Sequence, residues 1–223
     1  MELRTFSIAA RAARAGEFGV AVATARPAVG ALVPWVSARG AIATQARVNT
    51  DLGRHGLALV EHGVPIGTAL RGLLEADPER EIRQLHGVDA ADAFVHTGAR
   101  CVEWCGHLAG DGFTVAGNML AGEGVIKAMA EAFAAAESEE LSARLLAALE
   151  AGQASGGDKR GKQSAALPVA SAEPRGYHNL RVDDHADPVA ELRRVYEVAV
   201  AHWHRVGREY GQGAQRLFGR IKY

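Results

Sequence analysis

The sequence predicts a layered domain of the α+β or α/β class, and three features of its 223 residues lead to that prediction. Apolar residues make up 48% of the chain, which is enough to bury a substantial core within one domain. Short, near-continuous apolar runs come first, as in strands that are covered on both faces. The spacing of apolar residues then changes to a helical period and back, so that strands, helices and further strands follow one another.

Four apolar runs at the beginning of the chain predict two pairs of strands. TFSIAARA and FGVAVATA are separated by a break that contains Gly16, and ALVPWVSA and GAIATQAR by one that contains Gly40. From Leu52 to Glu75 the apolar residues recur at helical spacing. Because HGVPIG interrupts this pattern, it predicts two helices of about ten residues each.

The rest of the chain alternates between the two periods. Three strands are expected at EIRQLHGVD, AFVHTGA and GFTVAGNML. Two helices follow at VIKAMAEAFAAA and SEELSARLLAALEAG, the second with Ser138 as its expected N-cap. Two more strands are expected at KQSAALPVA and LRVDD. Asp187-Pro188 then predicts the start of a long last helix, with the aspartate as cap and the proline in the first turn.

Charge and cysteine content exclude several classes of function. The formal net charge is −1, from 25 basic and 26 acidic residues, so no electrostatic field favours nucleic acid or an anionic membrane. No stretch approaches the roughly 18 apolar residues of a spanning helix, and we expect a cytoplasmic protein. Cys101 and Cys105 are interpreted as ordinary thiols, because a zinc site would need two more ligands close by. Neither a metal nor a cofactor is predicted.

The motifs of the chain, taken together, resemble those of a known family. They are TFSIAARA, GEFGVAVATARPAVGALVPWV, GAIATQARVN, HTGARCVEWCGH, DGFTVAGNMLAG, GGDKRGKQSAAL and LRVDDHADPVAELRRVYE. In this order they resemble a widespread bacterial family known only as a domain of unknown function and grouped with the N-terminal-nucleophile (Ntn) hydrolase superfamily. The resemblance covers about residues 5 to 200. It implies an α+β, four-layer αββα sandwich over residues 1–201, followed by a basic and aromatic extension over residues 202–223.

The resemblance points to Thr5 as the catalytic nucleophile. In active members of the superfamily the first residue of the first strand attacks an amide carbonyl, and its own α-amine acts as the base. An α-amine has a pKa of about 8, which suits this role near neutral pH. Met1 to Arg4 precede Thr5 here, so cleavage after Arg4 is required to free that amine. The alternative is that Thr5 is simply a good strand residue.

Three further segments carry candidate catalytic residues. Gly117-Asn118 follows a strand, where a backbone N–H and the Asn amide could bind a developing oxyanion, although Gly-Asn is also a common turn. By resemblance, Asp158 and Ser164 would support the nucleophile, the alternative being a solvated loop with a structural aspartate. GGDKRGK fits the spacing of a P-loop, but Gln163 replaces the required Ser or Thr and a strand follows, so a P-loop is rejected.

Candidate substrate-binding residues are Arg26, Gln45, Asn49 and Arg160. Arg26 is the basic residue nearest to the position where related enzymes carry a lysine, although an arginine cannot shuttle a proton. Arg160 belongs to the glycine-rich, cationic segment, which suits a carboxylate or phosphate on a ligand. Gln45 and Asn49 lie where a strand gives way to a helix. They either line the mouth of the same site or are ordinary turn and capping residues.

Two hypotheses follow for the function. The first is an amidohydrolase or peptidase that acts on a small amide or peptide bond through Thr5. The second is a ligand-binding or assembly protein that keeps the Ntn fold without hydrolysis, because four residues precede Thr5 and no lysine comes before Lys127. A homodimer is the expected assembly, since closed two-fold assemblies are the commonest. The extension over residues 202–223 suits either self-association or a helical end that covers the core.

Overall fold

The structure, a computed structural model, describes residues 2–3, 5–12 and 15–213, which form a mixed α+β protein with two antiparallel sheets. The first sheet has the strand order β11-β10-β3-β2-β9-β8. In that order the strands span Asn179–Val182, Ser164–Ala170, Glu17–Thr24, Thr5–Ala12, Phe113–Gly117 and Gly106–Gly110. The second sheet has the order β1-β5-β6-β7, with β4 also paired to β5. These strands span Glu2–Leu3, Gly40–Arg47, Arg83–Asp89, Ala93–Thr97 and, for β4, Pro34–Ser37.

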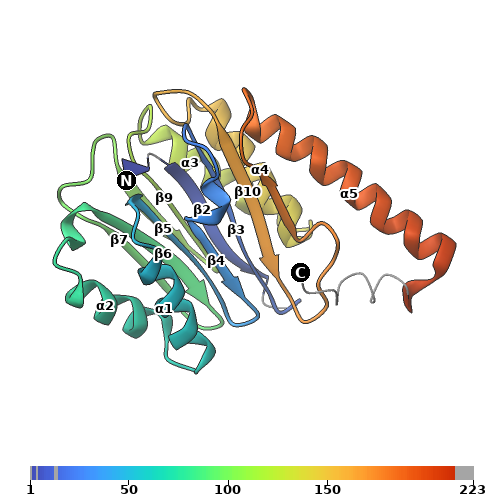
Figure 1. Ribbon diagram of the computed structural model, residues 1–223, viewed down its shortest axis with the longest axis horizontal. Coiled ribbons are helices and arrows are strands. Elements are labelled where there is room, and N and C mark those ends of the chain that lie inside the picture. Colours follow the sequence, from blue (N-terminus) through green and yellow to red (C-terminus); the bar gives the residue numbers. More distant parts are fainter. Residues whose placement is uncertain (1, 4, 13–14, 214–223) are drawn as a thin grey trace.

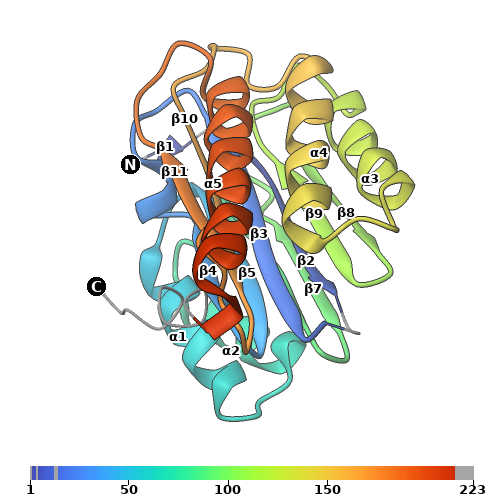
Figure 2. The ribbon, with the colours of Figure 1, turned by 90° about the vertical axis from the view of Figure 1, so that its right-hand side faces the viewer.

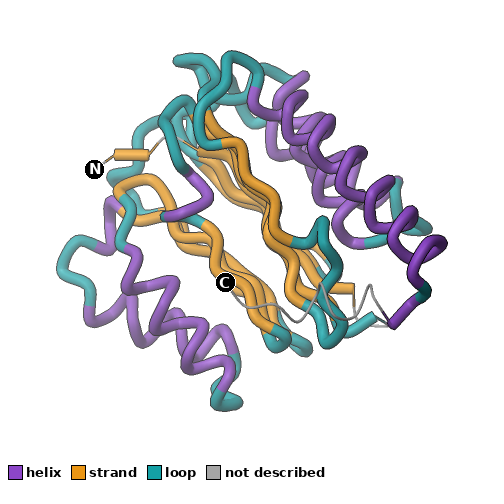
Figure 3. The backbone as a smooth tube through the Cα atoms, turned by 45° about the vertical axis from the view of Figure 1, so that its right-hand side comes forward, coloured by secondary structure: helices purple, strands orange, loops and turns teal. Residues whose placement is uncertain are grey.

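The two sheets face each other, and helices cover their outer faces (Figure 3). The helices α1 (Thr50–Glu61) and α2 (Ile66–Ala76) pack on the five-stranded sheet (Figure 1). The helices α3 (Gly124–Ala135), α4 (Leu141–Ala154) and α5 (Pro188–Tyr210) lie side by side over the six-stranded sheet (Figure 2). Two short 3-10 helices span Val29–Ala31 and Arg80–Ile82. Among the described residues, no helix is both long enough and apolar enough to cross a bilayer.

The two faces of strand β2 show how the layers are built. Side chains alternate along a strand, so residues two apart share a face. Phe6 and Ile8 pack into the core between the six-stranded sheet and its helices. Burial of such a side chain contributes about 1.5–3 kcal/mol. Thr5, Ser7 and Ala9 lie on the opposite face, where Ser7 bonds to β5 of the other sheet and Ala9 packs against apolar side chains.

The predicted order of strands and helices is confirmed, except that strands β1 and β8 were not predicted and that the N-cap of α4 differs. Strand β8 lies in the segment GHLAG, which no pattern predicted, because its alternation is between half-buried and exposed residues at the edge of the sheet. The N-cap of α4 is Glu140 and not Ser138, because the helix begins only at Leu141. The last helix runs through position 202 to Tyr210, while residues 214–223 of the predicted extension lie outside the described residues.

Candidate functional site

Thr5 and Asn118, two of the predicted catalytic residues, lie side by side. Thr5 opens β2 with its side chain buried on the face toward the other sheet, and it pairs with Thr24 of β3. The Thr5 hydroxyl is 3.5 Å from the Thr24 hydroxyl oxygen, which is long for a hydrogen bond between hydroxyls. The backbone N–H of Asn118, directly after Gly117 at the end of β9, donates to the Thr5 carbonyl oxygen at 3.0 Å.

Backbone strain is concentrated around this end of β2. Ala28, Ala46 and Met119 are non-glycine residues with left-handed backbones, at φ values of 57°, 66° and 54°. Each costs on the order of 1–2 kcal/mol relative to an ordinary conformation. Met119 follows Asn118, Ala46 pairs with Leu3, and Ala28 lies in the segment that follows β3. Strained residues cluster at sites where geometry serves function, so this end of the two sheets is the best candidate for a site.

Asp158 and Ser164 hold the segment that follows β3. One carboxylate oxygen of the buried Asp158 accepts from the backbone N–H of Ala25 at 3.1 Å. The Ser164 hydroxyl donates to the carbonyl oxygen of Arg26 at 2.5 Å and accepts from the N–H of Val29 at 3.1 Å. Among the described residues, these two side chains bond to this segment and the adjoining loop, and no bond joins them to the Thr5 hydroxyl. Direct support of the nucleophile by Asp158 or Ser164 stays a prediction.

The glycine-rich loop brings Arg160 back to Asp158. Gly156 and Gly157 have φ values of 110° and 50°, which a residue with a side chain rarely adopts, and the chain turns there. Asp158 then forms an isolated β-bridge with Leu120. The Arg160 guanidinium donates to the Asp158 carboxylate at 2.9 Å. The side chain of Arg26, the other predicted binding arginine, is exposed.

Gln45 and Asn49 point into different parts of the molecule. Gln45 is fully buried between the two sheets. Asn49 caps α1 by accepting from the N–H of Asp51 at 3.1 Å, and its amide donates to Asp77 at 3.3 Å. Asn49 also lines a polar depression of about 350 Å³ together with Arg83 and others. The structure therefore does not bring Gln45 and Asn49 into one mouth, and Asn49 acts as a cap.

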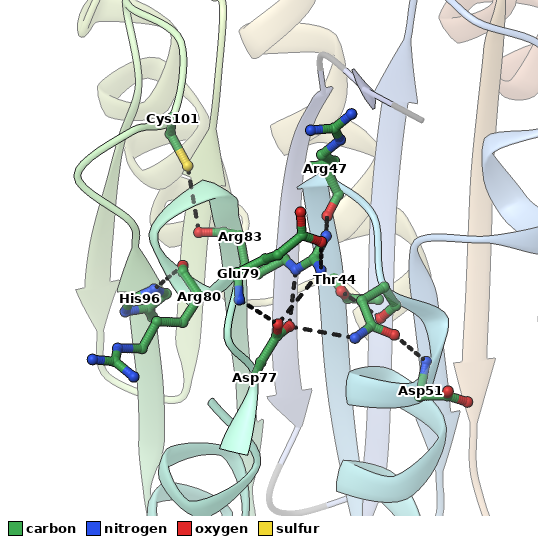
Figure 4. A network of polar contacts seen from close by, with 10 residues as sticks. Thr44, Arg47, Asp51, Asp77, Glu79, Arg80, Arg83, His96 and Cys101 are labelled. Atoms are coloured by element: carbon green, nitrogen blue, oxygen red, sulfur yellow. Dashed lines mark hydrogen bonds and ion pairs between the residues drawn. The ribbon is translucent and has the colours of Figure 1, made fainter. Parts of the chain in front are cut away.

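Asp77 and Arg83 form a buried ion pair beside this cap (Figure 4). The Arg83 Nε donates to Asp77 at 2.9 Å, and its Nη1 donates to the carbonyl oxygen of Arg47 at 2.7 Å. Burial by itself raises the pKa of Asp77, but the bonds from Arg83, from the N–H of Glu79 and from Asn49 outweigh it and lower that pKa. The pair thus fixes the end of β5, where Ala46 is strained.

A network of buried polar side chains, which sequence reasoning missed except for Gln45 and Asn118, crosses the space between the sheets. We call it the inter-sheet network, and its members are Ser7, Gln45, Gln84, His86, Thr114 and Asn118. The Ser7 hydroxyl lies 2.6 Å from Gln45 Oε1 and 2.8 Å from His86 Nε2. His86 Nδ1 is 2.9 Å from the Thr114 hydroxyl. Gln84 Oε1 accepts from Gln45 at 2.7 Å and from Asn118 Nδ2 at 3.1 Å.

His86 is uncharged in this network. Burial lowers its pKa to about 3, with a smaller contribution from the neighbouring His107. A neutral imidazole carries one proton, so one ring nitrogen donates and the other accepts. Within the described part of the chain, no group of three His, Cys, Asp or Glu side chains is arranged to hold a metal ion.

Fold and site together define an α+β protein whose two facing sheets enclose a polar network next to a buried threonine at the head of β2. The model of a family of unknown function, DUF1028, matches residues 5–192, and the chain belongs to this family. The crystal structure of protein SPO2555 from Silicibacter pomeroyi, assigned to DUF1028, is similar, with a TM-score of 0.82 and 30% sequence identity. That similarity covers 96% of this chain and 90% of the other. No curated protein gives a significant match.

Proposed function

We propose that this protein hydrolyses a small amide or peptide bond in the cytoplasm, with Thr5 as the nucleophile of an Ntn-type αββα sandwich and without a metal or cofactor. The observation that carries the proposal is the contact of Thr5 with Asn118 at the strained end of the sheets. A hydroxyl at the head of a strand, a neighbouring Asn and a strained backbone around both suit acyl transfer through a threonine once its α-amine is freed. We propose a homodimer as its assembly.

The reaction begins once the bond between Arg4 and Thr5 is cleaved. The freed α-amine takes the proton of the Thr5 hydroxyl, and the hydroxyl oxygen of Thr5 adds to the substrate carbonyl carbon. One N–H of the Asn118 amide would stabilise the resulting oxyanion. The C–N bond then breaks, and the amine product leaves with the proton held by the α-ammonium. Water, deprotonated by the same amine, hydrolyses the ester on Thr5 and releases the acid.

The position of the residues before Thr5 favours a second candidate function. Glu2 and Leu3 form β1 and pair with Arg47 and Ala46 of the five-stranded sheet, whereas Thr5 belongs to the six-stranded sheet. A segment built into a sheet in this way suits a protein that keeps these residues. Thr5 would then have no α-amine, and the fold would serve as a binding or assembly domain without hydrolysis.

Intact-mass spectrometry and an acylating probe separate the two candidates. Purified protein is expected to lack residues 1–4, and a β-lactone probe is expected to label Thr5. A panel of acyl p-nitroanilides then tests turnover, which Thr5→Ala should abolish. Thr68→Ala is the matched control, since that hydroxyl is exposed on α2. A variant in which Met1 directly precedes Thr5 is expected to gain activity if cleavage is limiting. The hydrolase function would be refuted if the purified protein has its full-length mass and the probe labels neither this protein nor the variant in which Met1 directly precedes Thr5.

A further inference from the structure

The direction of every hydrogen bond along the inter-sheet network can be assigned, because one end of it is anchored on backbone carbonyls. Gln84 Nε2 lies 2.9 Å from the carbonyl oxygen of Gly117 and 3.0 Å from that of Gly106. A carbonyl oxygen only accepts hydrogen bonds, so the atom of Gln84 that faces both must be its nitrogen. The other terminal atom of this side chain is therefore an oxygen, and it can only accept.

The next two side chains are fixed by the Gln84 oxygen. Gln45 and Asn118 both approach it, at 2.7 Å and 3.1 Å, so each must present its NH₂ group there. The Gln45 oxygen consequently faces Ser7, at 2.6 Å. Since this oxygen accepts, the Ser7 hydroxyl must donate its single proton to Gln45.

His86 then has only one tautomer open to it. The proton of Ser7 is already used, so at 2.8 Å the His86 Nε2 must donate to the Ser7 oxygen. In the neutral ring Nδ1 has no proton, and it accepts from the Thr114 hydroxyl at 2.9 Å. A serine activated by a histidine has the opposite arrangement, in which the hydroxyl donates to the ring nitrogen.

We infer that Gln84 is a positioning residue, which sets the direction of the inter-sheet network, orients the side-chain NH₂ group of Asn118, whose backbone bonds to Thr5, and keeps Ser7 from acting as a nucleophile. One proton of Asn118 Nδ2 is used by Gln84, and no other acceptor for this nitrogen is found among the described residues. Its second proton remains for a substrate oxygen. Only this last step rests on the proposed function, because the bond directions follow from the contacts and from the neutral state of the buried His86 ring.

The tautomer of His86 tests the assignment directly. In protein labelled with ¹⁵N-histidine, the protonated and unprotonated ring nitrogens have clearly different chemical shifts, and loss of one pair of signals in His86→Asn identifies the residue. We expect the proton on Nε2 at neutral pH. A proton on Nδ1 would overturn the inference, whatever the activity of the protein.

Two substitutions test whether the glutamines impose this tautomer. Gln45→Met removes the acceptor of the Ser7 proton at similar volume, so Ser7 should turn to His86 Nε2 and the ring proton should move to Nδ1. Thr114→Val is the matched control, since it removes the partner of Nδ1 and should leave the proton on Nε2. A ring that keeps Nε2–H in Gln45→Met would show that the glutamines do not set the direction.

The positioning role is tested by a pH profile. Gln84→Glu preserves the shape and the acceptor oxygen, but it can donate to the Gly117 carbonyl only while the introduced carboxyl is protonated. We expect kcat to fall about tenfold or more as pH rises through the pKa of that carboxyl, with KM little changed. An unchanged profile, in an enzyme that turns over, would refute the role of Gln84. The protein could also show no turnover while His86 carries its proton on Nε2 and moves it to Nδ1 in Gln45→Met. That result would refute the proposed hydrolase function and support the assigned bond directions.

Discussion

The space between the two sheets is filled in two different ways. Around β3, β4 and β10 it holds an apolar cluster, which we call the apolar half and which includes Ala9, Val20, Val22, Ala43 and Val88. Toward the beginning of β2 and the ends of β5 and β9 it holds the inter-sheet network, every member of which is at least 98% buried. Several strands take part in both halves.

This difference separates what holds the sheets together from what arranges the site. The apolar half stabilises the fold through buried area, which has no direction and tolerates changes of similar volume. Each polar side chain of the inter-sheet network is bonded to named partners, so removal of one leaves others buried without a partner. The predictions below test this contrast in order of expected effect.

The largest effect is expected on β6, where the two halves meet on one strand. Gln84→Leu removes the acceptor of the Gln45 and Asn118 NH₂ groups and a donor to the Gly117 carbonyl, and we expect it to lower the free energy of unfolding by about 4 kcal/mol. Val88→Ala removes two methyl groups from the apolar half and should cost about 2 kcal/mol. Urea denaturation of both variants measures the difference, and equal costs would contradict the contrast.

As pH falls, the polar half should begin to weaken above the pH at which most carboxylates titrate. The folded-state pKa of His86 is about 3, against about 6.5 unfolded, so the unfolded chain binds more protons between these values. The free energy of unfolding therefore falls as pH falls below about 6.5, at up to about 1.4 kcal/mol per pH unit. Down to about pH 4 the share of His86 is about 3 kcal/mol.

Comparison of two histidines identifies the source of this loss. Burial also lowers the pKa of His178, to about 4, and this residue lies outside the inter-sheet network. It adds a loss of the same sign over the same range. His86→Gln should clearly reduce the slope, and His178→Gln should reduce it by a similar share. If His86→Gln leaves the slope unchanged, His86 is not the neutral, buried base of the network.

The sequence predicted the apolar half much better than the polar half. Near-continuous apolar runs such as TFSIAARA indicate strands buried on both faces, and β2 is such a strand. A single serine within this run carries no sign that it meets a glutamine and a histidine from other strands. In RQLHGVD, Gln84 and His86 flank the apolar Leu85, as polar residues would on a half-exposed strand. The pattern gives the period, but not which layer covers the polar face.

The candidate site was predictable only as far as local position allowed. Thr5 and Asn118 were found because each lies at a strand end in a recognisable segment, and β2 and β9 are neighbours in the sheet. Gln45 was expected either at the mouth of a site or in an ordinary turn, but strand alternation turns it into the inter-sheet layer. Its partners are 38 and 39 residues away along the chain, and their approach depends on how the two sheets face each other.

A pair of reciprocal changes on β2 is expected to have an intermediate effect. Ser7→Ala leaves Gln45 Oε1 and His86 Nε2 without their shared partner, at a cost of about 2 kcal/mol. Ala9→Ser puts a hydroxyl among apolar side chains two residues further along the same face, at a cost of about 1–2 kcal/mol. Thermal denaturation with both variants checks this. A stabilising Ser7→Ala would show that the network is not satisfied as assigned.

The smallest effect, and one of opposite sign, is expected where the backbone is strained. Ala28 has a φ of 57°, so Ala28→Gly removes strain of about 1–2 kcal/mol while increasing the freedom of the unfolded chain by about 0.4–1 kcal/mol. The free energy of unfolding should therefore rise by about 0.5 kcal/mol. Ala9→Gly, in a regular strand of the apolar half, removes a buried methyl group and should lower it by about 1–2 kcal/mol. Chemical denaturation resolves the two signs. A loss at Ala28 as large as that at Ala9 would mean that the left-handed backbone near Thr5 stores no strain.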